Sequence, residues 1–198
     1  MKTNFITDSE EIKNGLLELG LDITEFNMPD FSSQQKRSHI ANHLKAVQKN
    51  FCRPIKNNDI THFLLDNLIN RTITSIFINF GYKISGLINF EIINHDDGER
   101  IILIKSICVP EGEEPGTGRK LIDYVKALAA KLRIQKIIVF PIDTASGFYL
   151  KQGFIDTGDT SFPGYLTYEV KGGGKRKTRT NKKKRFKIHK KRKTYKRK

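Results

Sequence analysis

A glycine-bearing segment at 113–121, EEPGTGRKL, has the residue types and the position of an anion-binding turn. It follows an apolar run at 101–109 and opens a helical pattern that continues to about Leu132. Gly116 and Gly118 would let the backbone approach a ligand without interference from a Cβ atom. The first N–H groups of a helix lack partners within the helix, and the helix dipole adds partial positive charge there. The segment therefore predicts a site for a phosphate or pyrophosphate group.

Two common nucleotide-binding patterns do not fit this segment. A nucleoside-triphosphate loop needs Gly, four residues and then Gly-Lys-Ser/Thr. Counted from Gly112, the second glycine position falls on Thr117, and no Lys-Ser or Lys-Thr pair follows. The dinucleotide fingerprint needs Gly-x-Gly-x-x-Gly, but the residue three positions after Gly118 is Leu121. The spacing excludes both patterns and leaves the phosphate-bearing ligand open.

The elements that must position this turn follow from hydrophobic periodicity. Helical spacing and capping residues predict helices near 9–19, 33–49, 59–68, 119–132 and 144–152. β-branched and aromatic runs predict strands near 4–7, 73–80, 84–93, 101–109, 136–140 and 164–170, with a short extended segment at 154–155. The three successive strands at 73–109 predict an antiparallel meander. The strand, turn, helix and strand over 101–140 predict a βαβ unit with parallel strands.

The chain divides by charge into two parts. Residues 171–198 contain 17 Lys and Arg and no Asp or Glu, so residues 1–170 hold the other 19 basic residues against all 21 acidic ones. We therefore expect a nearly neutral domain over 1–170 and a disordered Lys/Arg-rich tail over 171–198, joined through Gly172–Gly174. The tail predicts binding to nucleic acid or another polyanion. A nuclear-import signal or simple solubility would use the same composition.

Composition also bears on the compartment. No apolar stretch is long enough to span a bilayer, and the N-terminus lacks the apolar region of a signal peptide. Cys52 and Cys108 lie far apart and do not suggest a disulfide framework. We therefore expect an intracellular protein of the cytoplasm or nucleus, in a reducing environment and not secreted.

Two segments together resemble the GNAT superfamily of N-acetyltransferases. Its phosphate-binding turn reads Arg/Gln-x-x-Gly-x-Gly/Ala between a strand and a helix, and the segment at 113–118 resembles it, with Pro110 and Leu121 in the usual flanking positions. A second family segment reads Ala-x-x-Phe/Leu-Tyr-x-Lys-x-Gly-Phe. It is matched here by Ala145, Phe148, Tyr149, Lys151, Gly153 and Phe154. The strand motif Ile84-Ser-Gly86 is also similar. The resemblance covers about 73–170 well, 4–19 loosely, and 20–70 not at all.

The resemblance implies an α/β fold: a GNAT-like mixed, mostly antiparallel twisted sheet with flanking helices, over residues 1–170. It implies an N-acetyltransferase that moves acetyl from acetyl-coenzyme A (acetyl-CoA) to an amine of unknown identity by direct attack. Tyr149 would be the catalytic acid that protonates the departing thiolate. The implied coenzyme-binding residues are Ile107, Cys108 and Val109 for the pantetheine arm, and Gly116, Thr117, Gly118, Arg119, Lys120 and Ala145. No metal is implied.

The sequence departs from the family pattern at two places. Glu113 stands where the family usually has Arg or Gln, and Glu114 adds a second negative charge, which Arg119 and Lys120 would offset. The strand at 101–109 carries Lys105 but no carboxylate, so a general base would have to be Glu91 on the neighbouring strand or a water chain. These departures leave an alternative: a catalytically weakened GNAT-like module that binds nucleic acid through its tail.

Three other groups have simpler interpretations. His39 and His43 are four apart on a predicted helix, as zinc ligands can be, but no third ligand is evident and a solvated helix face is expected. Cys108 is expected to be a buried strand residue rather than a nucleophile. Lys105 is expected to be a charge at a strand edge.

Overall fold

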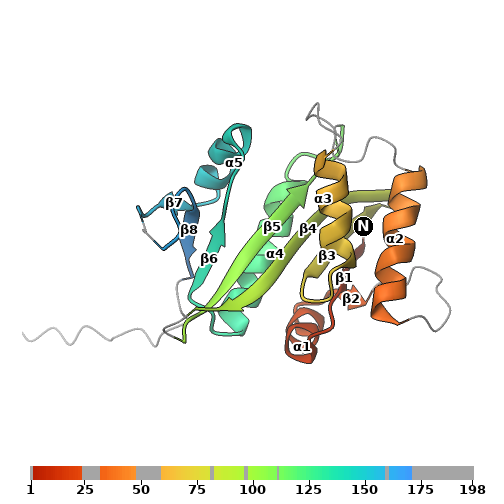
Figure 1. Ribbon diagram of the computed structural model, residues 1–198, viewed down its shortest axis with the longest axis horizontal. Helices are drawn as coiled ribbons and strands as arrows, with labels where there is room; N and C mark the ends of the chain where they lie inside the picture. Colours follow the sequence, from red (N-terminus) through yellow and green to blue (C-terminus); the bar gives the residue numbers. More distant parts are fainter. Residues whose placement is uncertain are drawn as a thin grey trace, which may run out of the picture.

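The computed structural model describes residues 2–23, 32–47, 59–80, 83–95, 98–110, 112–158 and 161–170. Its helices are α1 (Glu10–Glu18), α2 (Ser33–Val47), α3 (Asp59–Ile69), α4 (Thr117–Lys131) and α5 (Ser146–Lys151), with a 3₁₀ turn, η1, at Asp143–Ala145. Its strands are β1 (Lys2–Ile6), β2 (Asp22–Ile23), β3 (Thr74–Phe80), β4 (Lys83–Asn94), β5 (Arg100–Cys108), β6 (Lys136–Val139), β7 (Ile155–Asp156) and β8 (Leu166–Glu169). Figure 1 shows these elements as one sheet with helices on both faces.

The eight strands are ordered β2-β1-β3-β4-β5-β6-β8-β7. The predicted meander is confirmed, because β3, β4 and β5 pair antiparallel in succession. The predicted βαβ unit is also confirmed, since β5 and β6 are parallel and α4 connects them. The sequence patterns did not predict β2, a two-residue strand parallel to β1. Residues 81–82, between the first two strands of the meander, and the helical residues predicted at 48–49 lie outside the described residues.

The last strand is shorter than the 164–170 predicted. Residues 161–164 form a turn that ends with the Tyr165 N–H donating to the Phe162 carbonyl at 3.1 Å. Gly164 has φ 78°, a left-handed value that favours glycine. The strand therefore begins at Leu166, opposite Val139 of β6.

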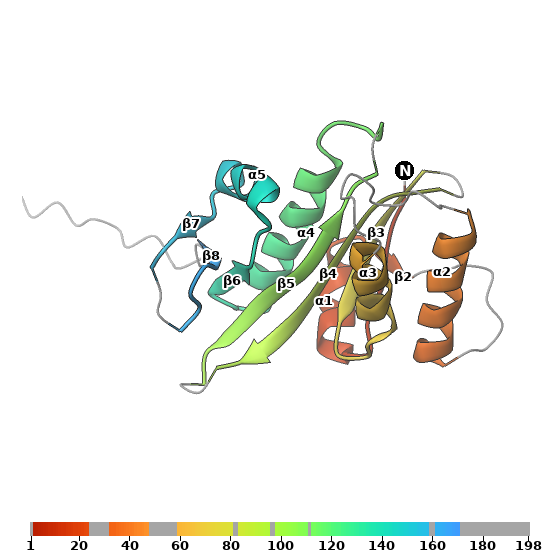
Figure 2. The ribbon, with the colours of Figure 1, turned by 45° about the horizontal axis from the view of Figure 1, so that its top comes forward.

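Two apolar cores lie on opposite faces of the sheet. Alternate strand residues point to opposite faces, so Ile76, Ile88 and Phe90 join α1 and α4 in one core. Phe77 and Leu87 join α2 and α3 in the other. Figure 2 shows α2 and α3 on the opposite side of the sheet from α4. We call these the α4 face and the α2/α3 face.

The first helix is fixed at both its start and its exposed side. The N-cap of this helix is Ser9, whose Oγ accepts from the Ile12 N–H at 3.4 Å. Glu11 receives two hydrogen bonds from the Arg100 guanidinium, at 2.9 and 2.7 Å. These bonds hold the pKa of Glu11 below its usual value. The pair attaches α1 to the start of β5.

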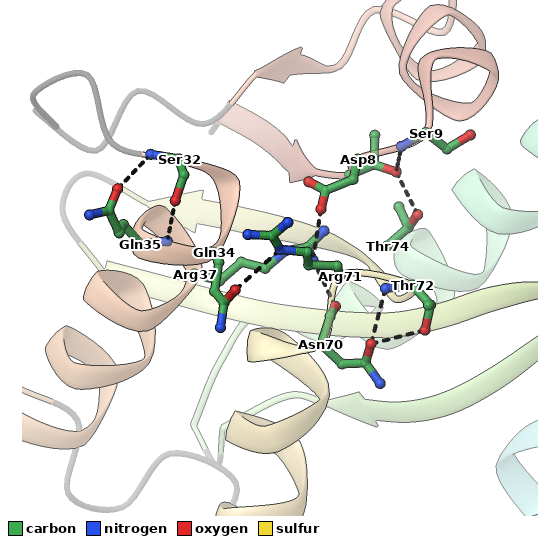
Figure 3. Close-up of polar contacts among 11 residues, drawn as sticks. Asp8, Ser9, Ser32, Gln34, Gln35, Arg37, Asn70, Arg71, Thr72 and Thr74 are labelled. Atoms are coloured by element: carbon green, nitrogen blue, oxygen red, sulfur yellow. Dashed lines mark hydrogen bonds and ion pairs between the residues drawn. The ribbon is translucent and has the colours of Figure 1, made fainter.

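A buried arginine connects α2 to the rest of the domain (Figure 3). Arg37 has no exposed surface. Its Nη1 donates to the Asn70 carbonyl at 2.7 Å and lies 3.6 Å from the Asp8 carboxylate. Burial lowers the pKa of Arg37, and the nearby Asp8 charge opposes that shift. Nearby, Arg71 Nε donates to Gln34 Oε1 at 3.2 Å. Arg37 thus joins α2, the β1–α1 connection and the α3–β3 connection.

Cys108, the last residue of β5, corrects one expectation. It is buried, as predicted. It is also disulfide-bonded, so the expectation that the cysteines are not bridged is wrong. Linear spacing gave no signal because the position of Cys108 on the α2/α3 face depends on the folded sheet. Within the described ranges, no helix combines the length and apolar character needed to cross a membrane.

Candidate functional site

The turn before α4 presents unpaired backbone donors, as the sequence predicts. Gly116 is the N-cap of α4 and has a left-handed φ of 95°. The Thr117 N–H donates to the Glu114 carbonyl at 3.2 Å, and the Lys120 N–H donates to the Gly116 carbonyl at 2.9 Å. Between them, the N–H groups of Gly118 and Arg119 have no carbonyl partner among the described residues. Such N–H groups at the positive end of a helix dipole suit an anion, and we call this turn the anion cradle.

Three glycines in or beside this turn have different structural roles. Nothing lies within 4 Å of a Cβ placed on Gly116, so its role is to adopt the left-handed backbone. A Cβ on Gly118 would lie 3.3 Å from Cζ of Phe148, so this glycine brings α4 close to α5. A Cβ on Gly86 of β4 would lie only 2.7 Å from the Thr117 Cγ2 atom. Gly86 therefore lets the start of α4 rest directly on the sheet.

The strands β5 and β6 pair for only part of their length. Their register runs from Ile101 opposite Lys136 to Ile104 opposite Val139. Beyond Ile104, β5 continues to Cys108 and pairs only with β4 among the described residues. Figure 1 shows the two strands parting toward their carboxyl ends. The edge of β5 that faces away from β4 therefore offers backbone groups over 105–108, next to the turn that starts α4.

Two of the three predicted pantetheine contacts lie on this edge, and the third follows it. Ile107 is half-buried and packs against the α4-face core. Cys108 points to the other face. Val109, which follows the strand, packs on the α4 face and lies 3.5 Å from a Cβ placed on Gly118. This small segment thus lies between the sheet edge and the anion cradle.

Tyr149 lies in the α4-face core, on α5. Its side chain is 3% exposed, and its ring packs edge-on against Phe148 and Phe154, with centroid distances of 5.1 and 5.6 Å. Burial raises the pKa of the Tyr149 hydroxyl above its usual value. The hydroxyl is therefore protonated at neutral pH, which is the state that an acid requires. Ala145, the last residue of η1, is half-buried against the same core.

Phe148 brings the two sequence motifs together. Its ring contacts Tyr149 and also lies against the Gly118 position at the start of α4. The residues of the two motifs are about thirty positions apart in the sequence. Through this one ring, the start of α4 and the buried tyrosine lie next to each other.

A lysine that the motifs did not indicate holds α5 in place. Lys126 of α4 lies over the Tyr168 ring at 4.0 Å and over the Phe154 ring at 5.7 Å. Its ammonium also donates to the Gln152 carbonyl. Burial lowers the pKa of Lys126. Because Phe154 also packs against Tyr149, Lys126 positions the tyrosine indirectly. In the sequence, Lys126 is one lysine of an amphipathic helix, and no specific pattern distinguishes it from other lysines.

The charges around the turn are arranged less simply than the sequence suggests. Glu113 is half-buried and Glu114 is exposed. Arg119 Nε lies 3.6 Å from the Asp123 carboxylate, one helical turn later. The Arg119 side chain therefore points along α4 toward Asp123, which offsets part of its positive charge. Lys120 is exposed beside it.

A carboxylate and an ammonium lie on the α2/α3 side of the β4–β5 pair. Lys105 is the extra residue of a β-bulge, where the register shifts between Asn89 and Phe90. Its Nζ lies 3.2 Å from Glu91 Oε1, and both side chains are mostly buried. Asn89 donates to the Ser106 hydroxyl at 3.0 Å beside them. The bulge occurs where β5 stops pairing with β6, so this ion pair lies close to the parting of the strands.

The two histidines considered as zinc ligands lie on α2. His39 is exposed and His43 is half-buried. Among the residues that the structure describes, no group of three or more His, Cys, Asp or Glu is placed to hold a metal ion.

Solved structures match the fold. No family model matches the chain, and no curated protein matches it in sequence. The KacTA–DNA complex is 18% identical, with 62% of this chain and 89% of that chain covered and a TM-score of 0.50. A GNAT-family acetyltransferase from Staphylococcus aureus Mu50 is 21% identical, covering 85% and 99%, with a TM-score of 0.46. Tetrahymena GCN5 is 14% identical, covering 86% and 96%, with a TM-score of 0.48. The chain has a fold similar to that of GNAT-family acetyltransferases, and at these identities the likeness concerns the fold alone.

Proposed function

We propose that the protein is an acyltransferase that moves an acetyl group from acetyl-CoA to an amine. The observation that carries the proposal is the contact of Phe148 with both Gly118 and Tyr149. It joins an anion cradle and a buried, protonated tyrosine, next to the part of β5 that does not pair with β6. A coenzyme with a pyrophosphate at one end, an amide-bearing arm and a thioester at the other end fits these three parts in order.

Each part of the site has a matching piece of coenzyme chemistry. The backbone of Gly116, Thr117, Gly118, Arg119 and Lys120 would hold the pyrophosphate at the positive end of the α4 dipole. The part of β5 that does not pair with β6, including Ile107 and Cys108, would bind the pantetheine amides as an added strand does. Val109 and Ala145 would line the arm. Glu113 and Glu114 reduce the positive potential of the cradle, so we expect modest coenzyme affinity.

The reaction is a direct displacement. The amine nitrogen attacks the thioester carbonyl carbon, a C–N bond forms, and the C–S bond breaks with its electron pair going to sulfur. Tyr149 donates its proton to that sulfur, and the proton lost by the amine passes to a base. Glu91 or a water chain could be this base. An acid so positioned typically contributes about 10²–10⁴-fold to the rate.

Coenzyme binding and turnover can be measured separately. We expect acetyl-CoA to raise the melting temperature, with a stabilisation of about 2.7 kcal/mol when its concentration is 100 times the Kd. We expect free thiol to be released when amines, polyamines or basic peptides are added with acetyl-CoA. The absence of both a melting shift and thiol release would contradict the proposal.

A second candidate is a coenzyme-binding module with little turnover that binds nucleic acid through residues 171–198. The two glutamates at the turn and the lack of a carboxylate on β5 favour it. It predicts a melting shift with acetyl-CoA but no thiol release. It also predicts binding to DNA or RNA that weakens steeply with salt. Contact with about eight phosphates would give a logarithmic slope of roughly −7.

A further inference from the structure

Four aromatic rings form a continuous row on the sheet, outside the proposed coenzyme site. Their order is His95, Phe162, Tyr165 and Phe140, with centroid distances of 5.5, 5.7 and 5.2 Å. Phe140 is 62% exposed, and the other three are partly exposed. None of them belongs to the two motifs. We call this set the aromatic row.

The aromatic row lies on the face away from α4. Val139 and Leu166 are paired residues whose side chains belong to the α4-face core. Phe140 and Tyr165 are their immediate neighbours in sequence, so they point to the opposite face. Phe140 also follows the last β6 residue that pairs with β5. This end of the row therefore lies where β5 and β6 part.

The other end of the aromatic row lies where the described chain ends. The Val170 N–H donates to the Gln135 carbonyl at 2.7 Å, just before β6 begins. At the same end, Lys136 pairs with Glu99 at 3.2 Å, and the His95 N–H donates to the Glu99 carbonyl. The described chain thus ends, at Val170, at the same end of the sheet as His95. The row leads from that end to the parting of the strands.

Charge and length make the tail a suitable occupant of the aromatic row. Residues 141–170 contain four acidic residues and one basic residue, whereas residues 171–198 carry 17 positive charges and no negative ones. Lysine and arginine bind to exposed aromatic faces through cation–π attraction. An extended residue spans about 3.3 Å, so about five residues can follow the row. Gly172–Gly174 permit the reversal that this path needs, because glycine adopts turn conformations without steric cost.

We infer that the aromatic row is a docking track for the protein's own basic tail, and that it delivers tail lysines to the proposed acetyl-transfer site. The acceptor would then be a lysine of this chain. With residues 175–179 along the row, Lys177 and Lys182 are the lysines nearest to the parting of the strands. This inference rests on the proposed function, because it requires bound acetyl-CoA. It adds the acceptor class and the path by which the acceptor arrives.

The chemistry is the direct displacement already described. A neutral lysine Nζ forms the new C–N bond to the acetyl carbon, and the C–S bond of the thioester breaks. The coenzyme leaves as its thiol, having gained a proton, and the lysine ends as a neutral amide. Each transfer removes one positive charge from the tail. Acetylation would therefore weaken both docking on the row and any binding to polyanions.

The test uses the full chain incubated with acetyl-CoA, followed by intact mass and peptide mapping. We expect acetyl groups first on Lys177 and Lys182, at a rate per molecule that does not change on dilution, since a tethered acceptor has a fixed effective concentration. The double variant Phe162→Leu with Tyr165→Leu keeps apolar bulk but removes two rings. We expect it to acetylate these lysines about tenfold more slowly.

Two matched variants control for general loss of apolar surface. Leu150 and Ile155 are exposed apolar residues outside the aromatic row, and Leu150→Ala and Ile155→Ala should acetylate the tail at the wild-type rate. Melting temperatures with and without acetyl-CoA establish that each variant folds and binds the coenzyme. A synthetic peptide of residues 171–185, supplied in excess, serves as a separate acceptor.

The outcomes separate this inference from the proposed function. Absence of both an acetyl-CoA melting shift and any thiol release would remove the proposed function itself. A melting shift with acetylation of the added peptide, but none of the protein's own tail, would overturn the inference alone. The inference would also be overturned if the double variant acetylated its tail at the wild-type rate. A double variant impaired only toward the added peptide would show that the row receives an external acceptor.

Discussion

The two faces of the sheet are held together by different kinds of contact. On the α4 face, the start of α4 rests on β4 because Gly86 has no side chain, and α5 meets α4 at Gly118 through the Phe148 ring. On the α2/α3 face, α2 packs in an apolar core, and the buried guanidinium of Arg37 also connects it to Asn70 and Asp8. The first arrangement depends on space, and the second depends on charge and hydrogen bonding.

This difference predicts which property a substitution on each face should change. A change on the α4 face displaces the anion cradle or Tyr149, so it should affect coenzyme binding or chemistry. A change at Arg37 leaves the cradle intact but removes the connection of α2, so it should affect the free energy of unfolding. Substitutions that are matched across the two faces can therefore break or sharpen the comparison.

The largest effect is expected for Tyr149→Phe. It removes the proposed acid but keeps the ring that packs against Phe148 and Phe154. We expect thiol release to fall about 10²–10⁴-fold, while the melting shift caused by acetyl-CoA stays the same. Tyr168→Phe is the control, since the Tyr168 ring under Lys126 would remain. An unchanged rate in Tyr149→Phe would assign the acid to another group.

The pH dependence of thiol release is a second test of the role of Tyr149. An acid must carry its proton, and burial raises the pKa of Tyr149 above the usual tyrosine value. Loss of activity through this group is therefore displaced to higher pH. Between pH 8 and 10, any fall in the rate of thiol release by wild type should also be seen with Tyr149→Phe. A wild-type decline near the ordinary tyrosine pKa of about 10 would contradict the buried position of Tyr149.

The next largest effect is expected for Arg37→Ala on the opposite face. The substitution leaves a cavity and removes the partner of the Asn70 carbonyl and the Asp8 carboxylate. We expect a loss of about 3 kcal/mol in the free energy of unfolding, measured by urea titration. The dissociation constant for acetyl-CoA should not change.

Two further variants separate charge from volume at this position. Arg71→Met removes an exposed arginine that bonds Gln34 and should change stability by less than about 0.5 kcal/mol. Arg37→Met keeps much of the volume without the charge, and Nε and Nη2 of Arg37 have no partner among the residues that the structure describes. If Arg37→Met were as stable as wild type, packing rather than charge would hold α2, and the contrast between the two faces would be lost.

The elements whose signals are local were predictable from the sequence. The meander, the βαβ unit and the turn at Gly116 follow from residue types within a few positions of one another, and all three are found. The motif pattern also predicts that Tyr149 and Gly118 belong to one site, and the Phe148 ring lies near both. Their roles in binding and catalysis remain predictions.

What could not be predicted depends on segments that meet only in the folded chain. Arg37 reads as one charge on a polar helix, and its burial requires Asn70 and Asp8 to approach it. Lys126 reads as a surface lysine until β8 brings Tyr168 beneath it. The same holds for the disulfide at Cys108 and for the aromatic row. Hydrophobic periodicity predicts the face of a helix or strand on which a residue lies. It does not predict which residue, distant in the sequence, packs against it.

Gly86→Ala tests the steric side of the comparison. The added methyl group would overlap Cγ2 of Thr117 and approach Leu121, both at the start of α4. We expect a loss of about 1–2 kcal/mol in the free energy of unfolding and weaker binding of acetyl-CoA, because the cradle must move. Gly147→Ala is the control, since nothing lies within 4 Å of its Cβ position. It should stabilise α5 by roughly 0.5–1 kcal/mol. Equal coenzyme affinity in Gly86→Ala and wild type would show that the cradle does not depend on this close approach.

The smallest effect is expected for Lys126→Met. The side chain keeps its length and apolar stem but no longer carries the charge over Tyr168 and Phe154. We expect a loss of about 1 kcal/mol in the free energy of unfolding and a several-fold slower thiol release, because Phe154 supports Tyr149. Lys151→Met is the matched control on α5. Lys151 belongs to the sequence motif but is exposed, so its substitution should change stability by less than about 0.5 kcal/mol. A larger effect at Lys151 than at Lys126 would mean that the motif, rather than the ring contacts, identifies the lysine that positions α5.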